Sequence, residues 1–145
     1  MTRILVATDG SEGADRALDY AALRAKADGA ELLIANVIGG YGLPDKLVRA
    51  FTQSQQVWLN ELLETYSAET LTKARDRARS IGVSTILLES RGGDVAQTLI
   101  EIAQEKKADL IIVGKRGAGR ISELLLGSVS QKLTQLSPLP VTVVP

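Results

Sequence analysis

Short, mostly apolar runs recur along the chain, and glycine, proline or aspartate bounds them. They cover residues 4–7, 32–38, 86–88, 110–113 and 141–144. Continuous apolar runs of this length between turn residues are typical of strands that are buried on both faces, as strands of a parallel sheet are. The pattern therefore predicts five buried strands.

Segments with a helical period separate these runs. Ser11 is placed to cap the first of these helices and Gly29 to end it. Similar apolar stripes follow Asp94 and precede Ser137, which predicts two more helices. In the first helix the apolar residues recur at spacings of three and four, as on one face of an amphipathic helix; they are Ala14, Ala17, Leu18, Ala21, Ala22 and Ala25.

The segment 45–81 contains neither glycine nor proline. It is predicted to be one long or kinked helix, or a loop followed by a helix. Large apolar residues share one face of its first half: Leu47, Phe51, Trp58, Leu62 and Tyr66. Its second half carries a basic cluster that we interpret as a solvated helix face rather than a binding patch: Lys73, Arg75, Arg77 and Arg79.

The alternation of strands and helices predicts an α/β fold. Because crossovers between parallel strands are right-handed, we expect a doubly wound, Rossmann-like sheet of five parallel strands with helices on both faces. The length fits one domain that spans residues 1–145. No helix follows the run 141–144, so we expect this strand at an edge of the sheet.

Composition excludes several classes of function. Seventeen basic residues balance seventeen acidic ones, and the aromatic residues are one Trp, three Tyr and one Phe, which argues against a nucleic-acid partner. The chain has no histidine and no cysteine, so the commonest general base, disulfides and thiolate metal sites are excluded. No apolar run could span a bilayer or serve as a secretory signal, so we expect a cytoplasmic protein without membrane contact.

Candidate chemistry lies where the predicted strands end. In a doubly wound sheet, ligands bind beyond the carboxyl ends of the strands, where the strand order reverses. The first run ends in Asp9-Gly10-Ser11, and the fourth in Gly114-Lys115-Arg116-Gly117, which is followed after nine residues by Gly127-Ser128. Glycines let backbone N–H groups approach a ligand, and a helix that opens at Ser128 attracts anions. The segment suits a polyphosphate.

Two familiar phosphate motifs do not fit these residues. A Walker A loop needs Ser or Thr after Gly-Lys and a glycine five positions before, but Gly114-Lys115 lacks both. A dinucleotide-binding G-x-G-x-x-G is absent after the first run. On the residues alone, a role of the glycines purely as strand-to-helix turns stays open.

Together these residues resemble the ATP-binding branch of the universal stress protein family. Gly114, Gly117, Gly127 and Ser128 have the G-2x-G-9x-G-[ST] spacing of that branch. The similarity extends over essentially the whole chain and includes the segments 4–11, 109–114 and 140–144. Two features depart from the common pattern: Asn36 stands where a histidine is frequent, and 45–81 matches no motif.

The resemblance implies an adenine-nucleotide alpha-hydrolase-like fold that holds ATP between the first and fourth strands. By analogy, Asp9 would contact adenosine, the Val37 backbone would bind adenine and Gly114 would lie by the ribose. Mg²⁺ or Mn²⁺ would be bound to the phosphates, with no dedicated metal ligands and no catalytic residues in the chain. The phosphates would be surrounded by Ser11, Arg116, Gly117, Gly127, Ser128, Val129 and Ser130.

The resemblance also implies a homodimer that pairs through Val141–Val144. The function it implies is a stress-response or regulatory one, in which nucleotide occupancy sets conformation or partner choice. Turnover is expected to be slow or absent because no base is evident. Two alternatives stay open: a low-rate ATPase or autophosphorylating phosphotransferase, and a nucleotide-free dimeric scaffold. AMP or a cyclic nucleotide could also replace ATP as the working ligand.

Overall fold

The computed structural model describes residues 2–39, 45–115 and 126–145. Each of the five apolar runs forms a strand, as predicted. The strands are β1 (Arg3–Ala7), β2 (Glu31–Ile38), β3 (Ile86–Gly92), β4 (Leu110–Gly114) and β5 (Val141–Val144). The helices are α1 (Glu12–Asp28), α2 (Asp45–Ala50), α3 (Gln53–Ile81), α4 (Val95–Glu105) and α5 (Ser128–Leu136).

The strands form one parallel sheet in the order β3-β2-β1-β4-β5. β1 lies at the centre, where Leu5 pairs with Leu33 of β2 and with Ile111 of β4. From β1 the chain builds the sheet outward to β3, and from β4 it builds in the opposite direction, so the order reverses between β1 and β4. The doubly wound α/β fold is confirmed, and β5 lies at an edge, as expected.

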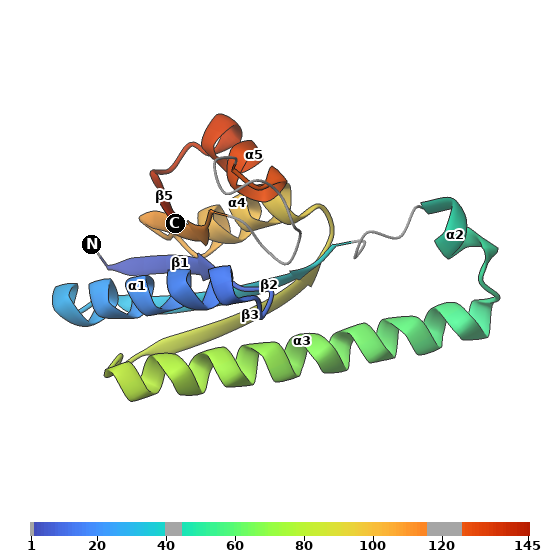
Figure 1. Cartoon of the computed structure of the whole chain (residues 1–145), viewed down its shortest axis with the longest axis horizontal. Helices are drawn as coiled ribbons and strands as arrows, with labels where there is room; N and C mark the ends of the chain where they lie inside the picture. Colours follow the sequence, from blue (N-terminus) through green and yellow to red (C-terminus); the bar gives the residue numbers. More distant parts are fainter. Residues whose placement is uncertain (1, 40–44, 116–125) are drawn as a thin grey trace.

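Alternate side chains of the central strands pack into two cores. On one face, Ile4, Val6 and Ile112 belong to a core with residues of α1 and α3. On the other face, Leu5 and Ile111 pack with residues of α4 and α5. Successive side chains of a strand point to opposite faces, so both faces must be covered. Figure 1 shows α1 and α3 on one side of the sheet and α4 and α5 on the other.

The predicted helix ends are present. The Ser11 Oγ accepts a hydrogen bond from the Ala14 N–H at 3.2 Å and caps α1. The Asp94 carboxylate accepts from the Gln97 N–H at 3.0 Å and caps α4. α1 ends at Gly29, which has φ +66°, a left-handed conformation that glycine adopts without steric cost.

The edge strands depart from the predicted burial on both faces. Beyond Leu88, β3 alternates between exposed and half-buried residues, and all four residues of β5 are half-buried. An edge strand has a neighbouring strand on one side only, so the helices that cover the central strands shield it less completely. An apolar run therefore predicted these strands but not their exposure.

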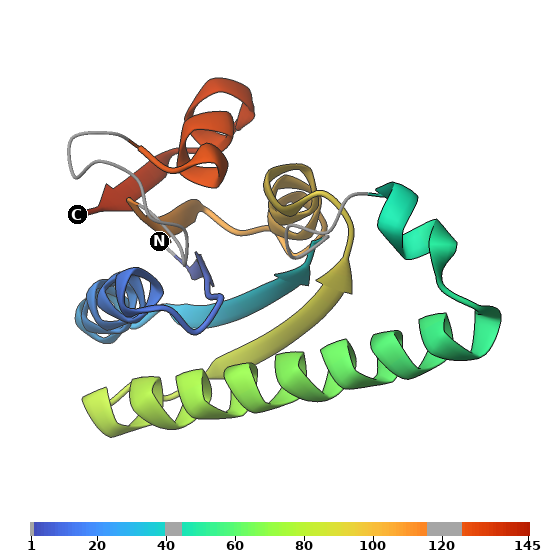
Figure 2. The same cartoon turned by 45° about the vertical axis from the view of Figure 1, so that its right-hand side comes forward.

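The segment 45–81 forms two helices, α2 and α3. α3 begins after Thr52, whose side chain and that of Gln55 cap each other's backbone N–H groups at 3.2 and 2.9 Å. Residues 53–66 contain no buried side chain, and this half of α3 extends beyond the sheet together with α2 (Figures 1 and 2). Trp58 is 62% exposed, so the shared apolar face is not a core face. Within the described ranges, no helix combines the length and the apolarity needed to cross a bilayer.

Because of an ion pair between α1 and α3, the stability of the fold is expected to decrease at acidic pH. Arg77 of α3 donates to both carboxylate oxygens of Asp19 at 2.6 and 2.8 Å, and these hydrogen bonds lower the pKa of Asp19. A carboxyl with a lowered folded-state pKa stabilises the fold above its unfolded pKa of about 4, and this contribution is lost as pH falls through the folded value. We expect Asp19→Asn to be less stable near neutral pH and to lose less stability on acidification, as measured by urea unfolding. Equal pH dependence of the two proteins would contradict this.

Candidate functional site

Local hydrogen bonds fix the turn after β1. The Thr8 N–H donates to the Ala35 carbonyl of β2 at 2.9 Å. The Thr8 Oγ1 accepts from the Gly10 N–H at 3.1 Å, and the Asp9 Oδ1 accepts from the Ser11 N–H at 2.9 Å. Gly10 has φ +81°. Asp9 is therefore held, exposed, at the carboxyl end of the central strand, with the Ser11 cap of α1 directly behind it.

Val37 lies at the carboxyl end of β2, two residues beyond Ala35. Backbone groups of alternate residues in a strand point to the same neighbour, and the Ala35 carbonyl bonds to Thr8 on the β1 side. The Val37 backbone therefore faces the β1 side at a point where β1 has already ended. Its carbonyl accepts from the Gly39 N–H at 3.0 Å, and its side chain packs in the core. A ligand at Val37 would thus meet backbone atoms.

Hydrogen bonds around Ser130 join α5 to the end of β4. The buried Ser130 Oγ lies 2.7 Å from the Gly114 carbonyl and 3.0 Å from the Lys115 carbonyl, and it donates to this pair. The Gly127 N–H donates to the Lys115 carbonyl at 2.7 Å. These bonds hold the first turn of α5 against Gly114.

A second contact fixes α5 from the side of α4. The Lys132 Nζ of α5 lies 2.9 Å from the carboxylate of Asp94, the residue that caps α4. The hydrogen bond from Lys132, together with the one from the Gln97 N–H, lowers the pKa of Asp94. Asp94 therefore stays ionised near neutral pH, and the two helices keep their N-termini at the same edge of the sheet.

Among the described residues, no side chain caps the first turn of α5. Its N-cap residue, Gly127, has no side chain to accept hydrogen bonds from the first-turn N–H groups, whereas Ser11 and Asp94 supply such caps to α1 and α4. Ser128, the first residue of the helix, is exposed. N–H groups without intrahelical partners and the helix dipole both attract negative charge. This end of α5 can therefore receive a phosphate.

The sheet brings the described candidate residues together at the carboxyl ends of its strands. β2, β1 and β4 are neighbours, and Val37, the Asp9–Ser11 turn and Gly114 lie at their carboxyl ends, with residues 127–130 beside Gly114. Val129 packs, half-buried, against the core on the α4 and α5 face. Arg116 and Gly117 lie outside the described residues, so their roles stay predictions.

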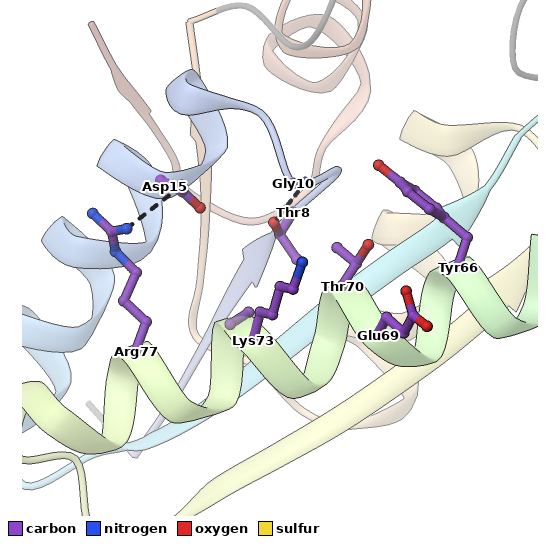
Figure 3. Close-up of a pocket in the computed structure, with 9 residues that line it drawn as sticks. Thr8, Gly10, Asp15, Tyr66, Glu69, Thr70, Lys73 and Arg77 are labelled. Carbon is purple, nitrogen blue, oxygen red and sulfur yellow. Dashed lines mark hydrogen bonds and ion pairs between the residues drawn. The ribbon is translucent and has the colours of Figure 1, made fainter.

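A cavity of about 310 Å³ lies beside the Asp9–Ser11 turn, between α1 and α3 (Figure 3). In Figure 3 the Lys73 amine points from α3 toward the turn. From sequence, Lys73 is predicted to be solvated and Tyr66 to belong to an apolar helix face, because no motif marks either residue. Only the packing of α3 beside α1 shows that they share this cavity, whose walls include Thr8, Gly10, Tyr66, Thr70 and Lys73.

Removal of the Ser130 hydroxyl is expected to reduce stability. Ser130→Ala leaves the Gly114 and Lys115 carbonyls without this donor, which should cost about 1–3 kcal/mol in the free energy of unfolding measured with urea. The matched control is Ser128→Ala, which changes an exposed hydroxyl on the same helix and should cost less than about 0.5 kcal/mol. A Ser130→Ala protein as stable as the wild type would contradict the contact.

Comparisons with known proteins agree on one family. The model of the Universal stress protein family matches residues 1–145. Universal stress protein YxiE of Bacillus subtilis is 33% identical over 145 residues, which cover 98% of this chain and 97% of the relative. The Thermus aquaticus universal stress protein in the QAH/OAS sulfhydrylase 3′ region is 35% identical over 144 residues, covering 97% and 96%.

Solved structures share the fold. A crystal structure of a universal stress protein in complex with cAMP superposes with a TM-score of 0.72 at 30% identity, covering 99% of this chain and 95% of that one. UspA from Lactobacillus plantarum reaches a TM-score of 0.82 at 24% identity, covering 99% and 97%. The fold, the sequence relatives and the family model all agree, and the chain belongs to the universal stress protein family.

Proposed function

We propose that this universal stress protein is an ATP-binding regulatory module of the stress response. The observation that supports it best is the convergence of three features at one edge of the sheet: the Asp9–Ser11 turn, the end of β2 and the uncapped first turn of α5. They meet where the strand order reverses, which is where doubly wound sheets bind ligands. One end of this edge offers backbone polar groups to a base, and the other attracts phosphate.

Different residues bind different parts of the nucleotide. Asp9 contacts adenosine, the Val37 backbone binds adenine, and Gly114 lies by the ribose. The phosphates lie against the first turn of α5, at Gly127, Ser128 and Val129, with Arg116 and the motif glycine Gly117 beside them.

Two of the proposed residues act through their hydrogen bonds. The Ser130 hydroxyl is engaged with the Gly114 and Lys115 carbonyls, so this residue contributes by holding α5 in place. The Ser11 hydroxyl caps α1, so Ser11 contributes by holding the turn that carries Asp9. When bound, Mg²⁺ neutralises charge on the phosphate oxygens, and Asp9 is the nearby carboxylate that fits it.

A relative supports an adenine nucleotide as the ligand. The universal stress protein solved in complex with cAMP is 30% identical to this chain. A cyclic nucleotide carries one phosphate, whereas the glycine motif and the open turn of α5 suit a longer phosphate chain. We therefore place ATP before cAMP and AMP as the ligand of this chain.

ATP is held rather than consumed under this proposal. The chain has no histidine, the commonest general base, so we expect activation of water to be slow. The rival is a low-rate ATPase that uses metal-bound water and Asp9. Phosphate release well above background that disappears in Asp9→Ala would favour the rival.

The dimer is proposed to form through β5. β5 pairs with β4 along Val141–Val144, and as the edge strand of the described sheet it has no strand on its other side. A half-buried, apolar edge invites pairing with another strand. A second copy of the chain, related by a two-fold axis, would supply that strand in a cytoplasmic homodimer.

Nucleotide binding tests the proposal. Mass spectrometry of the nucleotide released from the denatured protein identifies any co-purified ligand, and equilibrium dialysis against Mg-ATP compares the wild type with Ser128→Ala. We expect an adenine nucleotide and about a tenfold loss of ATP affinity in the variant, because a hydrogen bond to a charged phosphate is lost. Unchanged affinity in Ser128→Ala would argue that the glycines are only turns, as in a nucleotide-free scaffold.

A further inference from the structure

A relay of hydrogen bonds, two buried and one part-buried, ends at the turn after β1. The Asn36 Nδ2 on β2 donates to the Thr8 carbonyl at 2.7 Å, and the Asn36 Oδ1 accepts from the Ser67 Oγ of α3 at 2.7 Å. The Ser67 Oγ also lies 2.7 Å from the Ser90 Oγ of β3. Asn36 is 2% exposed and Ser67 is fully buried. The turn after β1 and three elements, β2, α3 and β3, thus share one chain of contacts.

The chemistry of these groups sets the direction of each bond. A carbonyl can only accept, so the Asn36 amide nitrogen must face Thr8 and its oxygen must face Ser67. The single hydroxyl hydrogen of Ser67 goes to Asn36, so Ser90 is the donor to Ser67. The orientation of the Asn36 amide is therefore determined on both sides.

Asn36 lies between two residues that the proposed function assigns to adenosine. It directly precedes Val37 in β2. Its amide fixes the carbonyl of Thr8, the residue before Asp9, while the N–H and the Oγ1 of Thr8 are engaged with Ala35 and Gly10. The Asn36 side chain thus ties the backbone that carries Asp9 to the strand that carries Val37.

We propose that Asn36 is a positioning residue of the nucleotide site, one that sets the spacing of Asp9 and Val37 and thereby the selectivity for adenine. This inference rests on the proposed function. Asn36 itself is buried and does not touch the ligand; Ser67, and Ser90 behind it, hold its amide in the required orientation. The proposed phosphate contacts lie at the N-terminus of α5, which contributes no residue to the relay.

Base selectivity separates positioning from a merely structural role. Asn36→Leu keeps the number and branching of the side-chain heavy atoms but cannot donate to Thr8, and Ser67→Ala removes the donor to Asn36. ATP and GTP share the triphosphate and the ribose and differ in the base, so the ratio of their calorimetric affinities measures the effect at the base. We expect the affinity for ATP to fall about tenfold in Asn36→Leu and about threefold in Ser67→Ala, with the affinity for GTP unchanged.

Amide exchange tests the relay without a ligand. In the ligand-free protein, NMR should show about fivefold or greater acceleration of the exchange of the Gly10 and Ser11 N–H groups with water in Asn36→Leu, with the amides of α4 unchanged. The matched control is Ala78→Gly, which perturbs a buried position near the far end of α3 and should leave both readouts unaltered.

The two readouts keep the inference separate from the proposed function. A wild type that binds no nucleotide would overturn the ATP proposal and, with it, the selectivity role of Asn36. Equal losses of affinity for ATP and GTP, or unchanged exchange at Gly10 and Ser11, would overturn the positioning role while ATP binding stands. If Asn36→Leu does not fold, Ser67→Ala decides by the same two measurements.

Discussion

Gly10→Val is expected to lose ATP affinity by about a hundredfold, which corresponds to about 2.7 kcal/mol. Gly10 has φ +81°, a conformation that a β-branched residue adopts only with strain. A Cβ at this position would also lie 3.5 Å from the Tyr66 hydroxyl and 3.6 Å from the Thr70 Cγ2, so the valine methyl groups would meet α3. Relaxation of the turn would then displace Asp9. Calorimetric titration with Mg-ATP measures the loss.

Gly29→Val is the matched control for this substitution. Gly29 also has a left-handed φ of +66°, but a Cβ there meets nothing within 4 Å, and the residue lies at the opposite end of α1. Both variants should lose stability by about 1–2 kcal/mol from backbone strain. Only Gly10→Val should also lose affinity for ATP. Similar ATP affinities in the two variants would contradict a role of the turn in binding.

Ile112→Ala is expected to have the largest effect on stability, about 2–5 kcal/mol in the free energy of unfolding. Ile112 has no exposed surface and lies on β4, between Val6 of β1 and Thr142 of β5, in the core shared with α1. The substitution opens a cavity in the middle of the sheet that rigid neighbours on both sides cannot fill. Thermal unfolding should shift down by roughly 10 °C.

Leu62→Ala provides the comparison for Ile112→Ala. Leu62 is 50% exposed on the half of α3 that extends beyond the sheet, so its truncation should cost less than about 0.5 kcal/mol. Ile112→Val, which removes one methyl group, should cost about 0.5–1.5 kcal/mol. A loss in Leu62→Ala as large as that in Ile112→Ala would show that this half of α3 is packed in solution.

The parts of the fold that follow from local rules could be predicted. Apolar runs identified all five strands, and Ser11 and Gly29 identified the ends of α1, because caps and strand burial depend on neighbours in sequence. Crossover handedness predicted a doubly wound sheet with helices on both faces, but not the order of its strands. These local rules also placed Gly114 and the N-terminus of α5 at the end of the sheet where the strands have their carboxyl ends.

Features that depend on distant packing could not be predicted. The apolar face at Trp58 and Leu62 has the spacing of a core helix, yet this half of α3 extends beyond the sheet (Figure 1), and Trp58 is 62% exposed and Leu62 50% exposed. The cavity beside Lys73 brings α3 to the turn after β1, and the relay through Asn36 joins residues 23 to 31 positions apart. Single-residue patterns carry no signal for such contacts, so Asn36 stood out in sequence only as a departure from a frequent histidine.

Calorimetric titration of Mg-ATP into the wild type and Gly117→Val tests the central claim most directly. Gly117 belongs to the glycine motif, and a valine there would place a branched side chain where the backbone is proposed to meet phosphate. We predict micromolar binding of one ATP per chain by the wild type and none by the variant. No heat with the wild type, or equal binding by both proteins, would contradict a phosphate site at this edge of the sheet.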